Sequence, residues 1–253
     1  NNNPFASGQG EMTQNITDVW LNMDGKAMGV FSLPITIPII GDEGEHEFIL
    51  TPGIKNNGIS STKTRYTFLE NYSVDLELSR TDTAQISPET QYFENLNFWV
   101  EDFENINNLK IEENPSSQVD LETSNDANIV KYGNYCGHIQ LTDVDTFFYA
   151  SAVDPMFLPQ NAGTNVFMEV DFMNTHDLSA RLIYSADGFT NDDALVTMAA
   201  QENPVWKKIY INLQEVILAR NDADFYAIAV RAIQSKVGVQ DIYIDNIKVI
   251  YQE

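Results

Sequence analysis

The sequence predicts an all-β protein in which a small β-sandwich precedes a larger, jelly-roll β-sandwich. Short runs of alternating apolar and polar residues recur along the chain, with turn residues such as Asp-Gly, Pro-Gly and Asn-Gly between them. A helical turn is expected at one place only, Val216–Arg220. Hydrophobic residues make up 43% of the 253 residues, which is enough to build real cores.

The charge balance argues against two classes of partner. The chain has 14 basic and 37 acidic residues, a formal net charge of −23. Such a chain repels the phosphates of nucleic acid and the anionic surfaces of membranes. No run of 18 apolar residues occurs, so no transmembrane segment is expected. The acid excess fits a soluble extracellular protein, and it also fits divalent-cation sites.

The single cysteine, Cys136, rules out a disulfide within the chain. Its place in a strand-like run favours a small buried residue over a nucleophile.

The first residues, 1–13, are mostly Asn, Gly, Ser and Gln, and they predict a flexible leader. Because the chain begins with Asn-Asn-Asn-Pro and not with Met, we expect an exported protein whose signal peptide has been removed.

Residues 14–90 are predicted to form the small sandwich. Two apolar runs flank Asp24-Gly25, a strong hairpin signal. Pro34–Ile40 is placed at a sheet edge, because its prolines lack ladder donors. A turn-rich segment follows over Pro52–Ile59, and Tyr72–Leu78 then alternates strictly. This order of hairpin, Leu-Pro strand, Pro-Gly-Ile loop and Tyr-x-Phe strand resembles transthyretin-like or immunoglobulin-like modules of bacterial cell-surface lipoproteins.

Residues 91–253 are predicted to form the second sandwich. The polar stretch Asn107–Asn128 is expected to be a loop. Strand-like runs then recur in the number expected of a jelly roll. They are Asn134–Leu141, Thr146–Ala150, Val166–Met173, Ser179–Ser185, Leu195–Ala199, Trp206–Leu213, Phe225–Ala232 and Asp241–Tyr251.

The last of these runs shows a one-residue slip. Ile242 and Ile244 share one face, but the apolar pattern resumes at Ile247 and Val249. A slip in period-two alternation predicts a β-bulge, here at Asp245-Asn246.

Four ordered features carry a family resemblance. They are Asp102-Phe103-Glu104, Tyr135–Ile139, Trp206–Lys208 and Tyr243–Ile247. Together they resemble jelly-roll domains of the galactose-binding and carbohydrate-binding-module type. The resemblance implies a structural calcium ion with Glu104 and Asp245 among its ligands, completed by backbone carbonyls and Asp102. The alternative is that Asp245 bonds backbone amides at the bulge while Glu104 is solvated.

Sugar binding needs a flat aromatic side chain with polar partners nearby. Phe147-Phe148-Tyr149 has one member pointing opposite to the other two, so one side of it must be exposed or covered by a loop. Tyr184 precedes a polar loop that contains Asp187 and Phe189. The predicted ligand-binding residues are Tyr149, Tyr184, Asp187 and Phe189, although aromatic residues of a β-sandwich more commonly fill its core.

Catalysis finds little support in the sequence. The three histidines are scattered, and no nucleophile or phosphate-binding motif appears. The best carboxylate pairs, Asp192-Asp193 and Asp143/Asp145, are interpreted as acidic loops. We therefore expect a non-catalytic glycan-binding protein, extracellular or on the outer cell surface, with a possible lipid anchor upstream of residue 1. A structural or adhesive protein that binds another surface protein is the first alternative, and a glycoside-active enzyme is the second.

Overall fold

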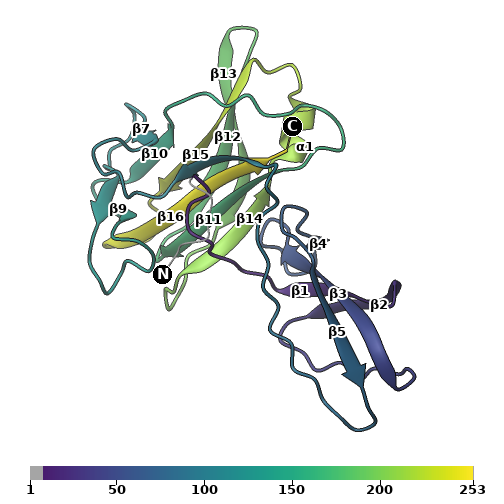
Figure 1. Cartoon of the computed structure of the whole chain (residues 1–253). Coiled ribbons are helices and arrows are strands. Elements are labelled where there is room, and N and C mark those ends of the chain that lie inside the picture. Colours follow the sequence, from purple (N-terminus) through teal and green to yellow (C-terminus); the bar gives the residue numbers. More distant parts are fainter. Residues whose placement is uncertain (1–7, 253) are drawn as a thin grey trace. The chain divides into compact units, whose positions relative to one another are not determined.

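The structure is a computed structural model that describes residues 8–252, and it divides into two compact units (Figure 1). One unit comprises residues 15–96, and the other comprises residues 97–252 together with residues 8–14. In the described chain, 16 β-strands and one short helix, α1 (Gln214–Ala219), confirm the predicted all-β class and the predicted helical turn. Between residues 8 and 252, no helix is long and apolar enough to cross a membrane.

The strands of residues 15–96 form one antiparallel sheet with the long strand β3 at its centre. The strands are β1 (Asp18–Met23), β2 (Lys26–Ser32), β3 (Gly44–Lys55), β4 (Lys63–Arg65) and β5 (Tyr72–Leu78). On one side of β3 lie β1 and then β2, and on the other side β5 and β4 share its edge. The hairpin predicted at Asp24-Gly25 is confirmed, because both residues have the positive φ of a two-residue turn, 49° and 74°.

In this unit a coil segment lies where the expected sandwich would have its second sheet. Val19, Leu21, Phe48 and Leu50 form a buried cluster on one face of the sheet. Ile37 and Ile39 pack against that cluster, but Pro34–Ile40 forms no strand, in contrast to the predicted edge strand. Pro34 and Pro38 lack the amide donors that a sheet ladder needs, so the segment covers a face of the sheet and does not extend its edge.

The loop predicted from Pro52 is instead the end of β3, which continues to Lys55. Pro52 accepts a hydrogen bond from the Tyr66 amide on the side of β3 where β5 has ended and β4 has not begun. The donor that proline lacks therefore falls in a gap between two partner strands, where it interrupts neither ladder.

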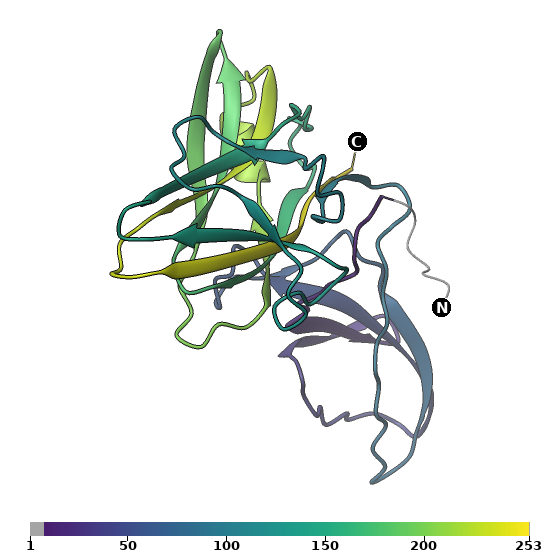
Figure 2. The same ribbon diagram turned by 90° about the vertical axis from the view of Figure 1, so that its left-hand side faces the viewer.

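Residues 97–252 form a β-sandwich of two antiparallel sheets (Figure 2). We name each sheet after its central strand. The β16 sheet has the order β14-β11-β16-β9-β8, with β6 also paired to β16, and the β15 sheet has the order β13-β12-β15-β10-β7. The strands are β6 (Asn97–Glu101), β7 (Ile111–Glu113), β8 (Glu122–Ser124), β9 (Cys136–Leu141), β10 (Phe147–Ala152), β11 (Val166–Asn174), β12 (Leu178–Ala186), β13 (Phe189–Met198), β14 (Lys207–Asn212), β15 (Phe225–Ile233) and β16 (Gln240–Tyr251). From β9 to β16 the chain crosses between the sheets at nearly every connection, as in a jelly roll.

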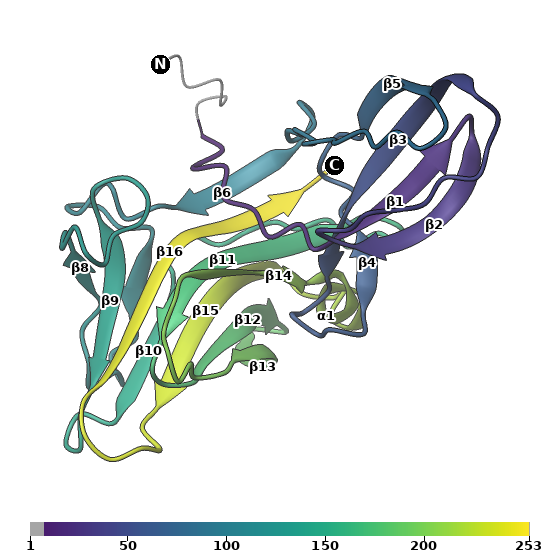
Figure 3. The same ribbon diagram turned by 90° about the horizontal axis from the view of Figure 1, so that it is seen from below.

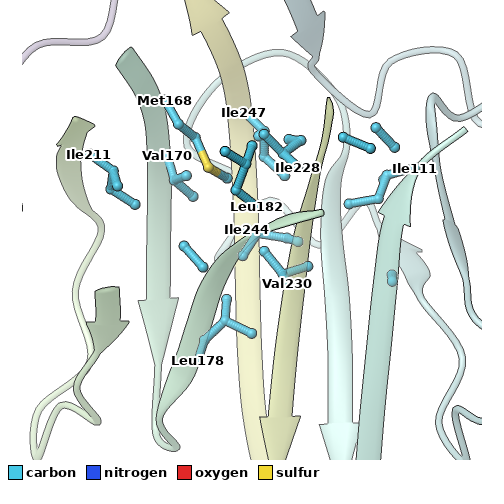
Figure 4. Packing of buried hydrophobic residues seen from close by; sticks show 14 of the residues in the cluster. Ile111, Met168, Val170, Leu178, Leu182, Ile211, Ile228, Val230, Ile244 and Ile247 are labelled. Carbon is cyan, nitrogen blue, oxygen red and sulfur yellow. The ribbon is translucent and has the colours of Figure 1, made fainter. Parts of the chain in front are cut away.

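The core lies between the two sheets (Figure 4). From the β16 sheet, Met168, Val170, Ile211, Ile244 and Ile247 point inward; from the β15 sheet, Ile111, Leu178, Leu182, Ile228 and Val230 meet them. These positions alternate along each strand, so the opposite positions face away from the core.

The bulge predicted in the closing strand is confirmed. The register between β11 and β16 shifts between Glu169 and Asp171, where Asn246 and Ile247 lie opposite the single residue Val170, one position later than predicted, and Asn246 has a φ of 46°. Before the bulge β16 pairs with β9, and after it with β6, so one edge of β16 serves two strands (Figure 3).

Two expectations for this unit require correction. The polar stretch Asn107–Asn128 contains the short strands β7 and β8, each of which pairs at a sheet edge. The strand predicted at Leu195–Ala199 begins much earlier, at Phe189, because a tight Asp187-Gly188 turn folds β12 and β13 into one long hairpin.

Part of the expected flexible leader is held against the sandwich, while residues 1–7 lie outside the described residues. Thr13 is buried: its hydroxyl donates to Asp171 Oδ2 at 2.5 Å and accepts from Lys208 Nζ at 2.8 Å. Lys248 Nζ donates to the carbonyl of Glu11 at 2.5 Å. The leader prediction is therefore wrong for residues 11–13, because they cover buried charges that need polar partners.

Candidate ligand-binding site

The outer face of the β15 sheet carries an aromatic pair. Phe148 is fully buried in the core, so strand alternation places Phe147 and Tyr149 outward, as predicted for this triplet. Their ring centroids lie 6.4 Å apart, and both side chains are half-buried. This strand therefore supplies aromatic surface outside the core.

Tyr149 lies across the sheet. Its hydroxyl donates a hydrogen bond to Asp192 Oδ2, 3.4 Å away on β13, although β15 and β12 lie between their strands. Neighbouring strands are about 4.8 Å apart, so the tyrosine side chain must extend sideways over both intervening strands. Ala229, on the outer side of β15, is fully buried, which is consistent with a ring lying above it.

Asp192 also anchors a buried arginine. Arg181 Nε donates to Asp192 Oδ2, and Arg181 Nη2 approaches the Asp192 carbonyl at 3.4 Å. The Arg181 side chain is only 8% exposed, whereas the Asp192 carboxylate is 31% exposed. Arg181 therefore lies within the sheet surface with its charge neutralised, and Asp192 keeps an edge toward solvent.

The β-sheet register aligns four polar or aromatic residues in one row. Arg231 on β15 pairs with Tyr149 on one side and with Ser179 on the other, and Ser179 pairs with Thr197 on β13. The row spans three strand spacings, about 14 Å, and ends at an exposed hydroxyl. We call this outer surface, with Tyr149, Arg181, Asp192 and Arg231 at its centre, the Tyr149 face.

The charges of the Tyr149 face shift two pKa values. The hydrogen bond from Arg181 holds the pKa of Asp192 below its usual range, and the positive charge of Arg231 acts in the same direction. Burial raises the pKa of the Tyr149 phenol, and the charge of Asp192 raises it further. At neutral pH the face therefore presents an ionised carboxylate, a neutral phenol and two guanidinium groups.

This combination can bind a polyhydroxylated ring. An aromatic side chain lying on a sheet can pack against the apolar face of a sugar, while carboxylate, guanidinium and hydroxyl groups bond its hydroxyls. Because Tyr149 is held by Asp192, little conformational freedom remains to be lost on binding.

The other three predicted ligand-binding residues lie elsewhere. Tyr184 is 9% exposed and belongs to the core-facing side of β12, where the Arg220 guanidinium lies 5.0 Å from its ring. Asp187 forms the hairpin turn with Gly188, and Phe189 beside it is 73% exposed. The structure therefore brings none of these residues together with Tyr149.

Sequence reasoning missed the polar half of the Tyr149 face. Asp192-Asp193 was interpreted as an acidic loop, but both residues lie in strand β13 and point to opposite faces. Asp192 meets Arg181, while Asp193 pairs with Arg220 at 3.1 Å. Arg181 and Arg231 could have indicated this polar face from the sequence. Each places a charge within an otherwise apolar strand, and one face of the sheet must accommodate that charge.

The residues predicted to bind calcium have other partners. Glu104 Oε1 accepts from the amides of Asn134 and Tyr135 at 2.7 and 3.0 Å, and Oε2 accepts from the Asn134 side chain at 2.8 Å. Burial alone would raise the pKa of Glu104, but these hydrogen bonds lower it on balance. Asp245 is buried; its Oδ1 accepts from the Asn246 amide at 2.7 Å, as the alternative interpretation expects, and its Oδ2 has no hydrogen-bond partner.

Calcium needs six to eight oxygen ligands. Residues 8–252 contain no group of three or more His, Cys, Asp or Glu side chains arranged to hold a metal ion. With the oxygens of Glu104 already bonded to N–H groups, this arrangement does not fit calcium, which stays a prediction from the sequence.

Two further features can be placed. Cys136 is fully buried, as predicted, and burial raises the pKa of its thiol to about 12.

A pocket of about 320 Å³ lies at one end of the sandwich, next to the exposed Phe157. Its polar groups already bond one another: Gln160 Nε2 donates to the Tyr226 hydroxyl at 3.2 Å, and that hydroxyl donates to the Arg220 carbonyl at 2.6 Å.

No protein-family model matches the chain, and no curated protein matches it. Among solved structures it is similar to a xylan-binding domain of carbohydrate-binding module family 22, at 14% identity and a TM-score of 0.39, over 60% of this chain and 92% of that one. It is also similar to a family 28 module specific for non-crystalline cellulose, at 10% identity and a TM-score of 0.41, over 58% and 91% of the two chains. A family 29 module matches at 12% identity and a TM-score of 0.38, over 61% and 85%. At TM-scores below 0.5, these similarities do not decide which ligand this chain binds.

Proposed function

We propose that this protein binds glycan through the Tyr149 face and does not convert it chemically. The observation that carries the proposal is the tyrosine laid across two strands, with its hydroxyl bonded to Asp192 at 3.4 Å. Sugar rings bind to surfaces of this kind, where an apolar ring face is bordered by fixed hydrogen-bonding groups.

The small side chains beside the central residues of the site support an extended ligand. Ala229, Ser151 and Ser179 lie next to the central residues, while the larger side chains of Phe147, Ile183 and Ile233 border them on the same face. A chain of sugar rings can lie across such a surface, with successive rings meeting Tyr149, Arg231 and the hydroxyl of Ser179.

The test is a glycan-array screen of the whole chain followed by calorimetric titration of each hit. We expect Tyr149→Ala to weaken binding at least tenfold, because it removes both the ring and its contact to Asp192. Tyr149→Phe keeps the ring but removes its bond to Asp192, so it should weaken binding less than Tyr149→Ala does.

Phe189→Ala is the matched control, because Phe189 is an exposed aromatic residue of the same unit that lies away from the Tyr149 face. Loss of binding in this variant, with Tyr149→Ala binding normally, would move the site to the hairpin tip. A folded protein that binds no glycan on the array would refute the proposal and favour a protein-binding, adhesive role.

Export to the cell surface, with a lipid anchor upstream of residue 1, also remains a proposal. Treating intact cells with a protease tests it, because a surface protein is digested while internal proteins survive.

A further inference from the structure

Arg231 differs from the other arginines of the chain. Arg80, Arg181 and Arg220 form ion pairs with Glu43, Asp192 and Asp193, and Arg65 lies 5.8 Å from the ring of Trp20. Arg231 makes no hydrogen bond, ion pair or ring contact with any residue of the described range 8–252. Among the arginines of this range, Arg231 is thus the one with neither an ion pair nor a ring contact, in a chain with 37 acidic residues.

The position of Arg231 is defined by the sheet. It lies inside β15, on the outer side, directly paired with Tyr149 and Ser179, and it is half-buried. A half-buried guanidinium has lost part of its water without gaining a protein acceptor, which is unfavourable unless a ligand supplies one.

The neighbouring charges leave Arg231 available. Asp192 is the acid of the Tyr149 face whose pKa the charge of Arg231 lowers, but its carboxylate is bonded to Arg181 and Tyr149. Glu112 is exposed on β7, separated from β15 by β10. A planar guanidinium with free donors is suited to bidentate bonding of a carboxylate.

We infer that the glycan bound at the Tyr149 face contains uronic acid, with its carboxylate paired to Arg231. This inference rests on the proposed glycan binding. A uronic acid packed on Tyr149 carries its carboxylate a few ångströms beyond the sugar ring. Arg231 is the direct cross-strand neighbour of Tyr149, so it lies within that reach. Ser179 and Thr197 then continue the row with hydroxyl groups for the next sugar.

The net charge of −23 opposes a polyanion at long range. Charges farther apart than about 8 Å are largely screened at physiological salt, so the local pair with Arg231 decides binding there. Short oligosaccharides are the appropriate probes, because they touch the Tyr149 face without meeting the acidic surface around it.

The experiment titrates the whole chain with short oligomers of galacturonate, glucuronate and mannuronate, each beside its methyl ester, at 150 mM salt (a physiological ionic strength). The ester keeps the sugar and removes the charge. We expect at least one acid to bind tenfold or more tighter than its ester, and we expect Arg231→Gln to abolish that difference. Arg231→Lys keeps the charge but loses the planar guanidinium. It should therefore retain only part of the difference in affinity between the acid and its ester.

The failures of the two proposals can be told apart. Esters or neutral glycans that bind as tightly as the acids, through Tyr149 and unaffected by Arg231→Gln, would overturn the uronic acid assignment and leave glycan binding intact. Binding of sulfated glycans but of no uronate would also overturn it. If no glycan of any charge binds the folded protein, the proposed function itself fails.

Discussion

The hydroxyl of Tyr149 bonds to the carboxylate of Asp192 at 3.4 Å, across two intervening strands of the β15 sheet. The same carboxylate neutralises Arg181, whose side chain is 8% exposed. One acid thus fixes an aromatic ring above the sheet and holds a buried charge within it.

Asp192→Asn should lower the free energy of unfolding at pH 7 by about 1–3 kcal/mol, because Arg181 would keep its charge without an ionised partner. The lowered pKa of Asp192 means that this stabilisation is complete above the pKa of the unfolded state and is lost as pH falls through the folded-state value. Urea unfolding should therefore show a large difference from wild type at pH 7 and a vanishing one only at a pH below the lowered folded-state pKa of Asp192.

Asp193→Asn is the matched control, since Asp193 is the next residue of β13 and pairs with the more exposed Arg220. We expect a cost of about 0–1 kcal/mol there, as is usual for exposed pairs. Equal costs for the two variants would contradict the role assigned to Asp192.

Asp245 should make the protein less stable as pH rises toward 8. Burial raises its pKa to about 8, and the charges of Asp171, Asp102 and Glu104 act in the same direction. The folded state then holds this proton more tightly than the unfolded state does. The contribution of Asp245 to the free energy of unfolding is therefore complete below about pH 4 and is lost between pH 4 and 8.

Asp245→Asn keeps the shape of the protonated acid, so it should unfold with a free energy that exceeds that of wild type at pH 8 and matches it only below about pH 4. Urea unfolding in the presence of EDTA measures both values. A variant that is less stable than wild type at pH 8 would show that the acid is ionised there and has a partner.

Calcium, as predicted from the sequence, requires an ionised Asp245. If calcium binds there, adding it should raise the Tm by mass action and EDTA should lower it. Asp245→Asn should then remove the response, while Asp187→Asn in the hairpin turn should keep it. Equal Tm values for wild type in calcium and in EDTA would refute the calcium prediction.

Thr13→Val should destabilise the sandwich unit by about 1–3 kcal/mol. The variant keeps the shape of the side chain but removes the hydroxyl that bridges Asp171 and Lys208, and it leaves both groups short of a buried partner. Thr13→Ser keeps the hydroxyl and should cost less. Urea unfolding of the whole chain distinguishes them, and a valine variant as stable as wild type would mean that residues 11–13 are not needed to cover the charges.

Much of the fold could be predicted because strand alternation and turn chemistry are local. The Asp24-Gly25 hairpin, the bulge that begins at Asn246 and the inward position of Phe148 all follow from patterns within a few residues. The errors arose where long-range pairing decides. Pro52 remains in β3 because its missing amide donor falls between the partner strands β5 and β4. The polar stretch Asn107–Asn128 forms edge strands because β10 and β9 offer free edges with which they pair.

The sequence by itself determined the all-β class, most of the longer strands of the second sandwich and the outward direction of Tyr149, since each depends on a period of two along one strand. Only the tertiary structure decided what Tyr149 meets. Asp192 is 43 residues away along the chain, and Arg231 becomes its neighbour through the register of β10 on β15. Register between distant strands is set by the packing of the whole core, and no local pattern records it.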